Sequence, residues 1–174
     1  VTINGSFLQG YFKRGLTHLE VGEYEKAAAD FSKSAEINPA FLEAVFNRGL
    51  SFFRKGDYQK AISDFDAVVK LDPENARAFF QRGMAIAALQ QHKKAIMDYD
   101  TAISLEPAYT LAYYHRGLSY FARQEYREAI EEFKKANRLN PEFSNSHFEC
   151  GRSYVALHES EKAIEEFATA LESD

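Results

Sequence analysis

The sequence predicts an all-α fold, an α-solenoid of stacked antiparallel helix pairs. One layout recurs every 34 residues without insertion or deletion. The first recurring pair is Arg14-Gly15, Arg48-Gly49, Arg82-Gly83 and Arg116-Gly117, with Cys150-Gly151 last. The second is Ala27-Ala28, Ala61-Ile62, Ala95-Ile96, Ala129-Ile130 and Ala163-Ile164, and the four prolines also share one position. A fixed period of this kind is typical of an array of one supersecondary unit rather than a single wound core.

Each repeat is expected to hold two helices, because apolar residues recur three or four apart in two stretches. In the second repeat the first stretch contains Phe46, Gly49, Leu50 and Phe53, and the second contains Ala61, Phe65, Val68 and Val69. The predicted division is an N-terminal extension of residues 1–7, four repeats at 8–41, 42–75, 76–109 and 110–143, and a truncated, uncapped fifth at 144–174. We expect one continuous repeat domain, with the extension disordered or lying in a groove.

A turn separates the two predicted helices of each repeat. In the second repeat Gly56 can take the left-handed conformation that ends one helix, and Asp57 can cap the next. Pro73 cannot continue the second helix, because it has no amide proton. The turns of the last three repeats contain no glycine, so their helix ends are harder to place. A glycine inside a helix costs about 1 kcal/mol relative to alanine, so its recurrence indicates close helix packing, with Gly49 facing Ala61.

Composition and charge exclude several classes of protein. A chain with 45% hydrophobic and 27% charged residues has ample material for a core and is not disordered. The formal net charge of -5 argues against nucleic-acid binding, since phosphate contacts need a basic surface. No apolar stretch approaches the roughly 18 residues of a membrane span, and no secretory signal is visible. The single cysteine, Cys150, excludes an internal disulfide, so we expect the reducing cytoplasm, with the nucleus as the alternative.

The second repeat resembles the tetratricopeptide-repeat (TPR) signature in the identity and spacing of Gly49, Phe52, Tyr58, Ala61, Phe65 and Pro73. The other repeats match nearly as well, so the resemblance covers about residues 8–174. The departures, which weaken single contacts, are His18, Ser34, Val68, His92 and Ser160. The resemblance implies a right-handed superhelix of antiparallel helix pairs with the first helices lining a concave surface. It also implies a protein-interaction module without catalytic activity.

An acidic residue follows each repeat arginine by 16 positions. The arginines stand where the TPR family usually has leucine, and the pairs are Arg14 with Asp30, Arg48 with Asp64, Arg82 with Asp98 and Arg116 with Glu132. Because guanidinium and carboxylate groups match in a two-point contact, we expect each pair to bridge the two helices of its repeat. The alternative is a set of unrelated solvated charges. In the fifth repeat Cys150 replaces the arginine while Glu166 remains.

The first helices carry a second apolar stripe that we expect to face a ligand groove. Its aromatic register holds Phe12, Phe46, Phe80, Tyr114 and Phe148. A helix apolar on two sides needs two burial partners; neighbouring repeats supply one, and a ligand in the groove would supply the other. The alternative assigns the aromatic register to the core between repeats. The predicted peptide-binding residues are Phe12, Phe46, Asn47, Leu50, Phe53, Arg54, Arg77, Phe80, Gln81, Met84, Tyr114, His115, Leu118 and Phe121.

The leading interpretation is a non-enzymatic scaffold whose groove binds a peptide or helix of a partner protein. Asn47 and Gln81 would bond the peptide backbone, and Arg54 and Arg77 an acidic side chain. One alternative is a substrate-targeting domain of a larger enzyme. Another is a co-chaperone-type adaptor for acidic C-terminal tails, but that clamp resembles this chain only at Asn47, so a hydrophobic or helical ligand fits better. A third is self-association through uncapped repeat ends.

No motif for catalysis or cofactor binding is present in the sequence. There is no phosphate-binding glycine loop, no HEXXH, no paired CXXC and no nucleophile elbow. The five histidines are scattered at positions explained by packing or exposure, so we expect no metal site and no cofactor. Cys150 is expected to be a buried structural thiol rather than a nucleophile.

Overall fold

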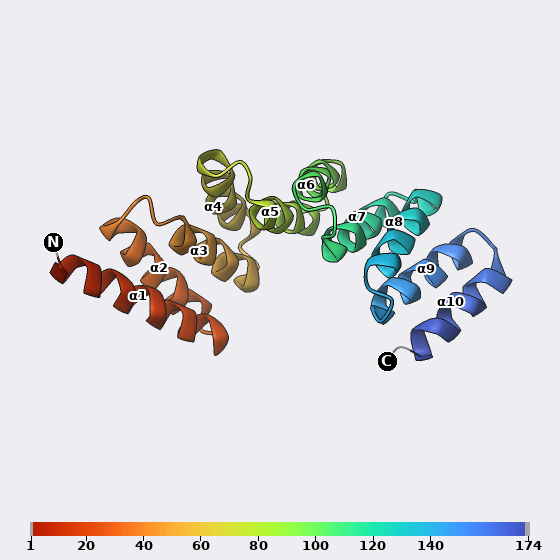
Figure 1. Ribbon diagram of the computed structural model, residues 1–174, viewed down its shortest axis with the longest axis horizontal. Helices are drawn as coiled ribbons and strands as arrows, with labels where there is room; N and C mark the ends of the chain where they lie inside the picture. The colour runs from red at the N-terminus through yellow and green to blue at the C-terminus, as the bar shows by residue number, and fades with distance from the viewer. Residues whose placement is uncertain (1, 173–174) are drawn as a thin grey trace. The chain divides into compact units, whose positions relative to one another are not determined.

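The computed structural model describes the backbone of residues 2–172 and the side chains of residues 7–172, and ten α-helices without any strand occupy this part of the chain (Figure 1). The predicted all-α solenoid of helix pairs is confirmed. The helices form two compact units, Val1–Leu89 and Gln90–Asp174, and each unit is described by itself.

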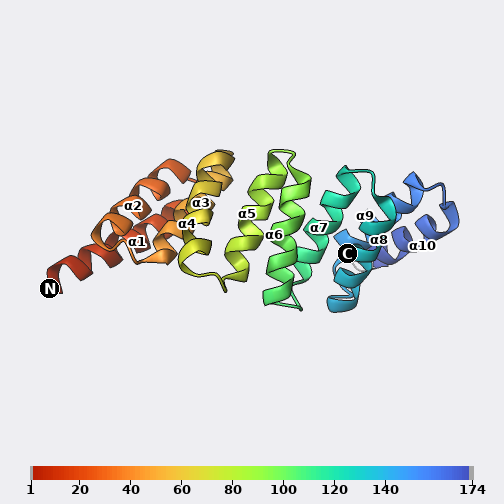
Figure 2. The same cartoon turned by 90° about the horizontal axis from the view of Figure 1, so that it is seen from above.

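Unit 1 comprises α1 (Thr2–Glu20), α2 (Tyr24–Ile37), α3 (Leu42–Lys55), α4 (Tyr58–Leu71) and α5 (Ala76–Ala88). Unit 2 comprises α6 (His92–Leu105), α7 (Thr110–Ala122), α8 (Tyr126–Leu139), α9 (Ser144–Ala156) and α10 (Ser160–Glu172). Within each unit every helix packs against the next along the chain (Figure 2). The odd-numbered helices, the first helices of the predicted repeats, also contact one another: α1 with α3, α3 with α5, and α7 with α9.

The chain is helical ahead of the first predicted repeat. Helix α1 begins at Thr2, so the expectation of disorder is wrong for residues 2–7, and Val1 lies outside the described residues. Leu8 is buried, and its carbonyl accepts a hydrogen bond of 3.0 Å from the Ser34 hydroxyl on α2. This contact holds the middle of a helix rather than its start, since α1 continues a further turn and a half toward the N-terminus.

The repeat glycines allow a first helix to approach an aromatic ring of the second helix. A Cβ added at Gly49 would lie 2.9 Å from Phe65 Cε1, and one added at Gly117 would lie 2.6 Å from Phe133 Cε1. Both rings are 0% exposed. The expected close packing is therefore present, but the neighbour that requires glycine is the phenylalanine ring and not Ala61.

The three turns without glycine adopt the same left-handed backbone as the two turns with glycine. Gly22 and Gly56 have φ angles of 78° and 89°. At the same register Gln90, Gln124 and His158 have φ angles of 61°, 63° and 60°. This conformation ends a helix and is unfavourable for residues with a side chain, so these three turns carry local backbone strain.

The expected cap at Asp57 is not formed. Its side chain accepts no capping hydrogen bond at the start of α4 and instead lies 2.8 Å from the ammonium of Lys60. A lysine three residues along the helix offers the carboxylate a charged donor that competes with the backbone amides. A side-chain cap is present at Asn75, whose Oδ1 accepts a hydrogen bond of 3.0 Å from the Ala78 amide.

Candidate functional site

The arginine–carboxylate bridge is present in the repeats whose two helices share a unit. Arg48 donates from Nε to Asp64 Oδ2 at 2.9 Å and from Nη2 to Asp64 Oδ1 at 2.6 Å. Arg116 donates to Glu132 from Nε at 2.8 Å and also from Nη2. The carboxylate side chains are 8% exposed in both pairs, so the predicted bridges are confirmed here as part-buried contacts between helices.

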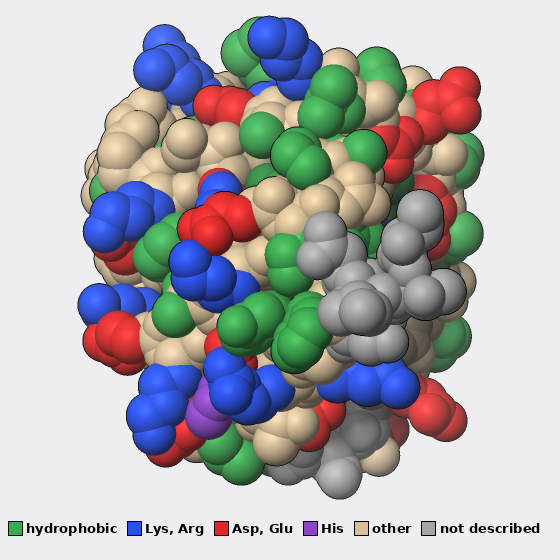
Figure 3. All heavy atoms as spheres, turned by 90° about the vertical axis from the view of Figure 1, so that its left-hand side faces the viewer, with side chains coloured by type: hydrophobic (Ala, Val, Ile, Leu, Met, Phe, Trp, Pro, Cys, Tyr) green, Lys and Arg blue, Asp and Glu red, His purple; other side chains and the backbone are tan. Residues whose placement is uncertain are grey.

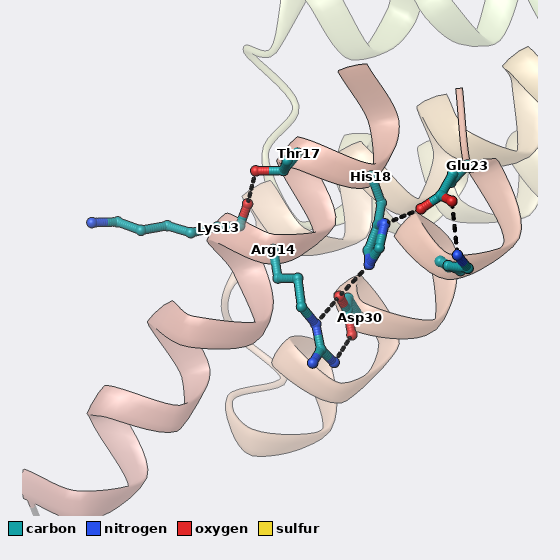
Figure 4. Close-up of polar contacts among 7 residues, drawn as sticks. Lys13, Arg14, Thr17, His18, Glu23 and Asp30 are labelled. Carbon is teal, nitrogen blue, oxygen red and sulfur yellow. Dashed lines mark hydrogen bonds and ion pairs between the residues drawn. The ribbon is translucent and has the colours of Figure 1, made fainter. Parts of the chain in front are cut away.

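In the first repeat a histidine joins the same contact, as Figure 4 shows. Arg14 donates to Asp30 through Nε at 2.7 Å and Nη2 at 2.6 Å. His18 Nε2 lies 3.8 Å from Asp30 Oδ2, and its Nδ1 lies 2.6 Å from Glu23 Oε2. His18, a departure from the TPR signature, therefore links two carboxylates instead of filling an apolar position.

The same arginines also reach the preceding second helix. Arg48 Nη1 donates to the Ser32 hydroxyl at 3.3 Å, and Arg82 Nη1 donates to Asp66 Oδ1 at 2.7 Å. Arg116 makes the corresponding contact with Asp100. Each partner lies 16 residues before its arginine. The guanidinium group thus ties its own repeat to the one before it, a role that the sequence interpretation missed because it paired each arginine with one carboxylate.

In the fifth repeat a histidine replaces the missing arginine as the partner of Glu166. His147 Nδ1 lies 2.7 Å from Glu166 Oε2 and 3.1 Å from Asn137 Nδ2. Cys150, at the arginine position, is a free thiol with 0% exposure. Burial first, and then the nearby Glu166, raise the pKa of this thiol well above its ordinary range, so it is not activated as a nucleophile.

Part of the predicted aromatic stripe lies in the core. Phe12, Phe46 and Phe80 are 7%, 8% and 3% exposed. The Phe12 ring packs 5.6 Å from Phe31, and the Phe46 ring packs 5.5 Å from Phe65. In the free chain these three side chains offer little surface to a ligand, which corresponds to the alternative interpretation as core between repeats. The physical reason is that the next repeat already covers this side of the first helix.

One crevice does join two of the predicted residues, Phe46 and Arg77. It encloses about 200 Å³ and is lined by Leu42, Glu43, Phe46, Val68, Asn75 and Arg77, from α3, α4, α5 and the residue before α5. The guanidinium of Arg77 lies 5.2 Å from the centre of the Phe46 ring, a cation–π contact. The edge of the Phe46 ring therefore lies under a cation that is itself exposed.

The remaining predicted residues of unit 1 are partly accessible. Leu50, Phe53 and Met84 are half-buried, as are the polar side chains of Asn47 and Gln81, whereas Arg54 is exposed. The Asn47 amide nitrogen donates to the Glu43 carbonyl of its own helix at 2.7 Å. This bond occupies part of the donor capacity that the sequence interpretation assigned to a peptide.

The predicted residues of unit 2 gather on α7. The Tyr114 ring lies 5.0 Å from Phe143 and 5.3 Å from His115, and all three side chains are half-buried. Burial lowers the pKa of His115 to about 4. Leu118 and Phe121, also half-buried, belong to the apolar cluster around Tyr154.

A cation also covers the last of these aromatic rings. The guanidinium of Arg152 lies 4.9 Å from the centre of the Phe121 ring. Its Nη1 donates to both carboxylate oxygens of Glu149, at 3.0 and 2.9 Å. An aromatic ring of one first helix thus lies under an arginine of the next in both units, at Phe46 and at Phe121.

Neither a metal-binding cluster nor a membrane-spanning helix occurs in the described part of the chain. No group of three or more His, Cys, Asp or Glu side chains among those residues is arranged to hold a metal ion. None of the described helices combines the length and the apolar character needed to cross a membrane.

Repeated helix pairs, joined by left-handed turns and stacked through a glycine and an aromatic ring, define a helical-repeat protein. The profile described as tetratricopeptide repeat matches residues 12–76 and 46–107, and one described as TPR repeat matches residues 117–158. The chain therefore belongs to the tetratricopeptide-repeat family.

Several solved structures are similar to this chain over most of its length. MamA 41-end from Desulfovibrio magneticus RS-1 has a TM-score of 0.88 at 28% identity, covering 96% of this chain and 94% of that one. A crystal structure of MamA has a TM-score of 0.86 at 27% identity, covering 97% and 92%. YrrB, described as a TPR protein with an unusual peptide-binding site, has a TM-score of 0.76 at 23% identity, covering 94% and 84%, and shows the fold alone. The search of curated proteins returned no match.

Proposed function

We propose that this chain is a non-enzymatic scaffold that binds a peptide or helix of a partner protein on the surface of its first helices. Tetratricopeptide-repeat proteins are protein-interaction scaffolds, and this chain is one by family and fold. The observation that carries the finer proposal is the crevice between α3, α4 and α5, where exposed Arg77 stands over the Phe46 ring. An apolar wall beneath an exposed cation is suited to a ligand with both apolar and acidic side chains.

The surface next to the crevice supports a ligand longer than one residue. Leu50 and Met84 are half-buried apolar side chains of adjacent first helices, and Gln81 lies between them and Arg77 in the sequence of α5. Exposed Arg54 adds a second cation at the other end of α3. We expect a segment that buries apolar side chains on this stripe and places carboxylates near the two arginines.

Two other functions compete with this one. The adaptor for acidic C-terminal tails receives some support from Arg54 and Arg77, but two positions of that clamp hold Phe12 and Phe46, which are buried and uncharged. The substrate-targeting domain of a larger enzyme would use the same binding surface, so it differs from the scaffold in what is attached to the chain and not in the contact.

A peptide-display selection tests the proposal even though the partner is unidentified. The chain is used to select from a random peptide library, and the enriched peptides are then titrated by fluorescence anisotropy. We expect peptides that combine apolar and acidic residues, with affinity at least tenfold weaker for Arg77→Glu. The matched control is Lys70→Glu, the same charge reversal at an exposed position of α4, which should bind as the parent does.

Two results would contradict the proposal. One is a selection that enriches no peptide. The other is enriched peptides whose affinity is equal for the parent, Arg77→Glu and Lys70→Glu. A peptide with a free acidic C-terminus, titrated in parallel with its C-terminal amide, separates the tail-adaptor function: only that function requires the free carboxylate.

A further inference from the structure

Helix α1 exposes a surface that the later first helices bury. Ala44, Ala78, Ala112 and Ser146 share one position of α3, α5, α7 and α9, and each is 0% exposed. The α1 residue at this position is Gly10, which is exposed, and a Cβ added there would meet nothing within 4 Å. Around it lies an open hollow of about 360 Å³ lined by Phe7, Gly10, Tyr11 and Arg14, the α1 face. Figure 3 views the side of the molecule where α1 lies, and hydrophobic and basic side chains are intermixed there.

Helices α9 and α10 expose the opposite half of the same kind of contact. They form a crevice of about 390 Å³, the α9–α10 crevice, lined by Ser144, Asn145, Phe148, Phe167, Ala170 and Leu171. Its residues hold the positions that Leu42, Glu43, Phe46 and Val68 hold in the crevice of the second repeat. There Asn75 and Arg77, from the start of the third repeat, complete the lining, and the volume is only about 200 Å³. The α9–α10 crevice is thus a repeat junction without the helix that covers it.

The exposed aromatic residues show how the two surfaces match. Where one repeat meets the next, the aromatic residue just before a first helix packs on the aromatic register of the preceding first helix: Phe41 lies 4.8 Å from Phe12, and Phe143 lies 5.0 Å from Tyr114. Phe7 holds the position of Phe41 and Phe143 but is 59% exposed. Phe148 holds the position of Phe12 and Tyr114 but is 49% exposed. Each therefore has the side chain of a repeat junction without the opposite ring.

The charges of the two surfaces are complementary as well. The Arg14 side chain is 62% exposed on the α1 face. In later repeats the arginine at this position also reaches a residue 16 positions earlier on the preceding second helix. The α10 residue at that position is Ala168, and exposed Glu165 and Glu172 lie three residues before and four after it, on the same helix face. A guanidinium placed there by the repeat geometry would meet a carboxylate on either side.

We propose that the α1 face of one copy of this chain docks into the α9–α10 crevice of a second copy, continuing the repeat stack across the junction between molecules. Phe7 then packs on Phe148, Gly10 fits against Phe167 as Ala44 fits against Phe31, and Arg14 approaches the acidic face of α10. The contact is head to tail, so each copy keeps one free surface of each kind and the assembly grows with concentration. This inference is independent of the peptide-binding surface proposed above.

A mixing experiment tests the proposal through the asymmetry of the contact. Gly10→Arg blocks the α1 face, and Leu171→Asp, at a side chain 81% exposed, blocks the crevice; both positions are exposed, so circular dichroism should show the parent fold. By sedimentation equilibrium we expect the parent to rise above 19.8 kDa with concentration and each variant alone to stay at that mass. An equimolar mixture of the two variants should form a one-to-one dimer and nothing larger, because each supplies the surface that the other lacks.

The control and the contradicting results are equally specific. Met97→Asp changes a side chain on α6 that is 67% exposed but outside both surfaces, and it should associate as the parent does. A parent chain that stays monomeric at every concentration would overturn the proposal. So would blocked variants that still associate alone, or a mixture of them that remains monomeric.

Discussion

Arg48 on α3 holds Asp64 on α4 through two hydrogen bonds, and the same guanidinium reaches Ser32 on α2. The Asp64 side chain is 8% exposed and that of Arg48 is 27% exposed, so the carboxylate depends on the arginine more than the arginine depends on it. A charged group that has lost its solvent requires a partner of opposite charge. The contact therefore fixes how two repeats and three helices fit together, rather than adding a surface ion pair.

Removing the arginine alone should cost more than removing both partners. We expect Arg48→Met to lower the free energy of unfolding by about 2 to 3 kcal/mol, because it leaves a nearly buried carboxylate unpaired. The double variant Arg48→Met/Asp64→Leu should recover most of that loss. Urea denaturation followed by circular dichroism measures both, with Arg14→Met, at a more exposed arginine, expected to lose less. Equal losses in the single and double Arg48 variants would show that the unpaired charge is not the cause.

Two glycines of α1 should respond in opposite directions to the same substitution. A Cβ at Gly15 would lie 2.8 Å from Phe31 Cε1, whereas a Cβ at Gly10 would meet nothing within 4 Å. We expect Gly15→Ala to destabilise the fold by about 1 to 3 kcal/mol through overpacking. Gly10→Ala should stabilise it by up to about 1 kcal/mol through helix propensity. Thermal melts of the two variants provide the comparison, and a shift in the same direction for both would contradict the close approach at Gly15.

The helix pairs could be predicted from the sequence because each is specified locally. An apolar stripe, a turn and a proline repeat every 34 residues, and each repeat contacts only its neighbours. The arginine bridge was predictable for the same reason, since Arg48 and Asp64 keep a fixed spacing in every complete repeat.

What could not be predicted depends on contacts between helices that the spacing does not specify. The stripe of Phe12, Phe46 and Phe80 has the same pattern whether a ligand or the next repeat covers it, and the structure gives it to the core. His147 pairs with Glu166 from another turn of α9 than the arginine register uses, so no recurring spacing revealed it. Only the sidedness of the α1 face and the α9–α10 crevice, visible in exposure, separates them from the junctions inside the chain.

The left-handed glutamines allow a stabilising substitution. Gln124 has a φ angle of 63°, at the register where Gly56 has 89°. We expect Gln124→Gly to raise the free energy of unfolding by about 0.5 to 1 kcal/mol, because relief of the left-handed strain exceeds the extra entropy of glycine in the unfolded chain. The reverse change, Gly56→Gln, should lower it by a similar amount. Denaturant midpoints measure both, and a loss of stability in Gln124→Gly would show that the glutamine side chain contributes more than its backbone costs.

His115 should make the fold less stable as the solution becomes mildly acidic. Its pKa is lowered to about 4 by burial beside Tyr114 and Tyr99, whose rings lie 5.3 and 6.3 Å away. In the unfolded chain an unperturbed histidine titrates near pH 6.5. Between these two values the unfolded state binds a proton that the folded state does not, so stability falls as the pH drops through this window.

The size of that effect follows from the distance between the pH and the unfolded pKa. At about pH 5 the loss relative to neutral pH should be about 2 kcal/mol, and it should disappear in His115→Gln, which carries no titrating group. Urea denaturation of both proteins at the two pH values isolates the histidine, because the carboxylates common to both cancel in the difference. An NMR titration of the five histidines gives an independent reading. A His115 ring that titrates near pH 6.5, or a pH dependence that survives in His115→Gln, would contradict this assignment.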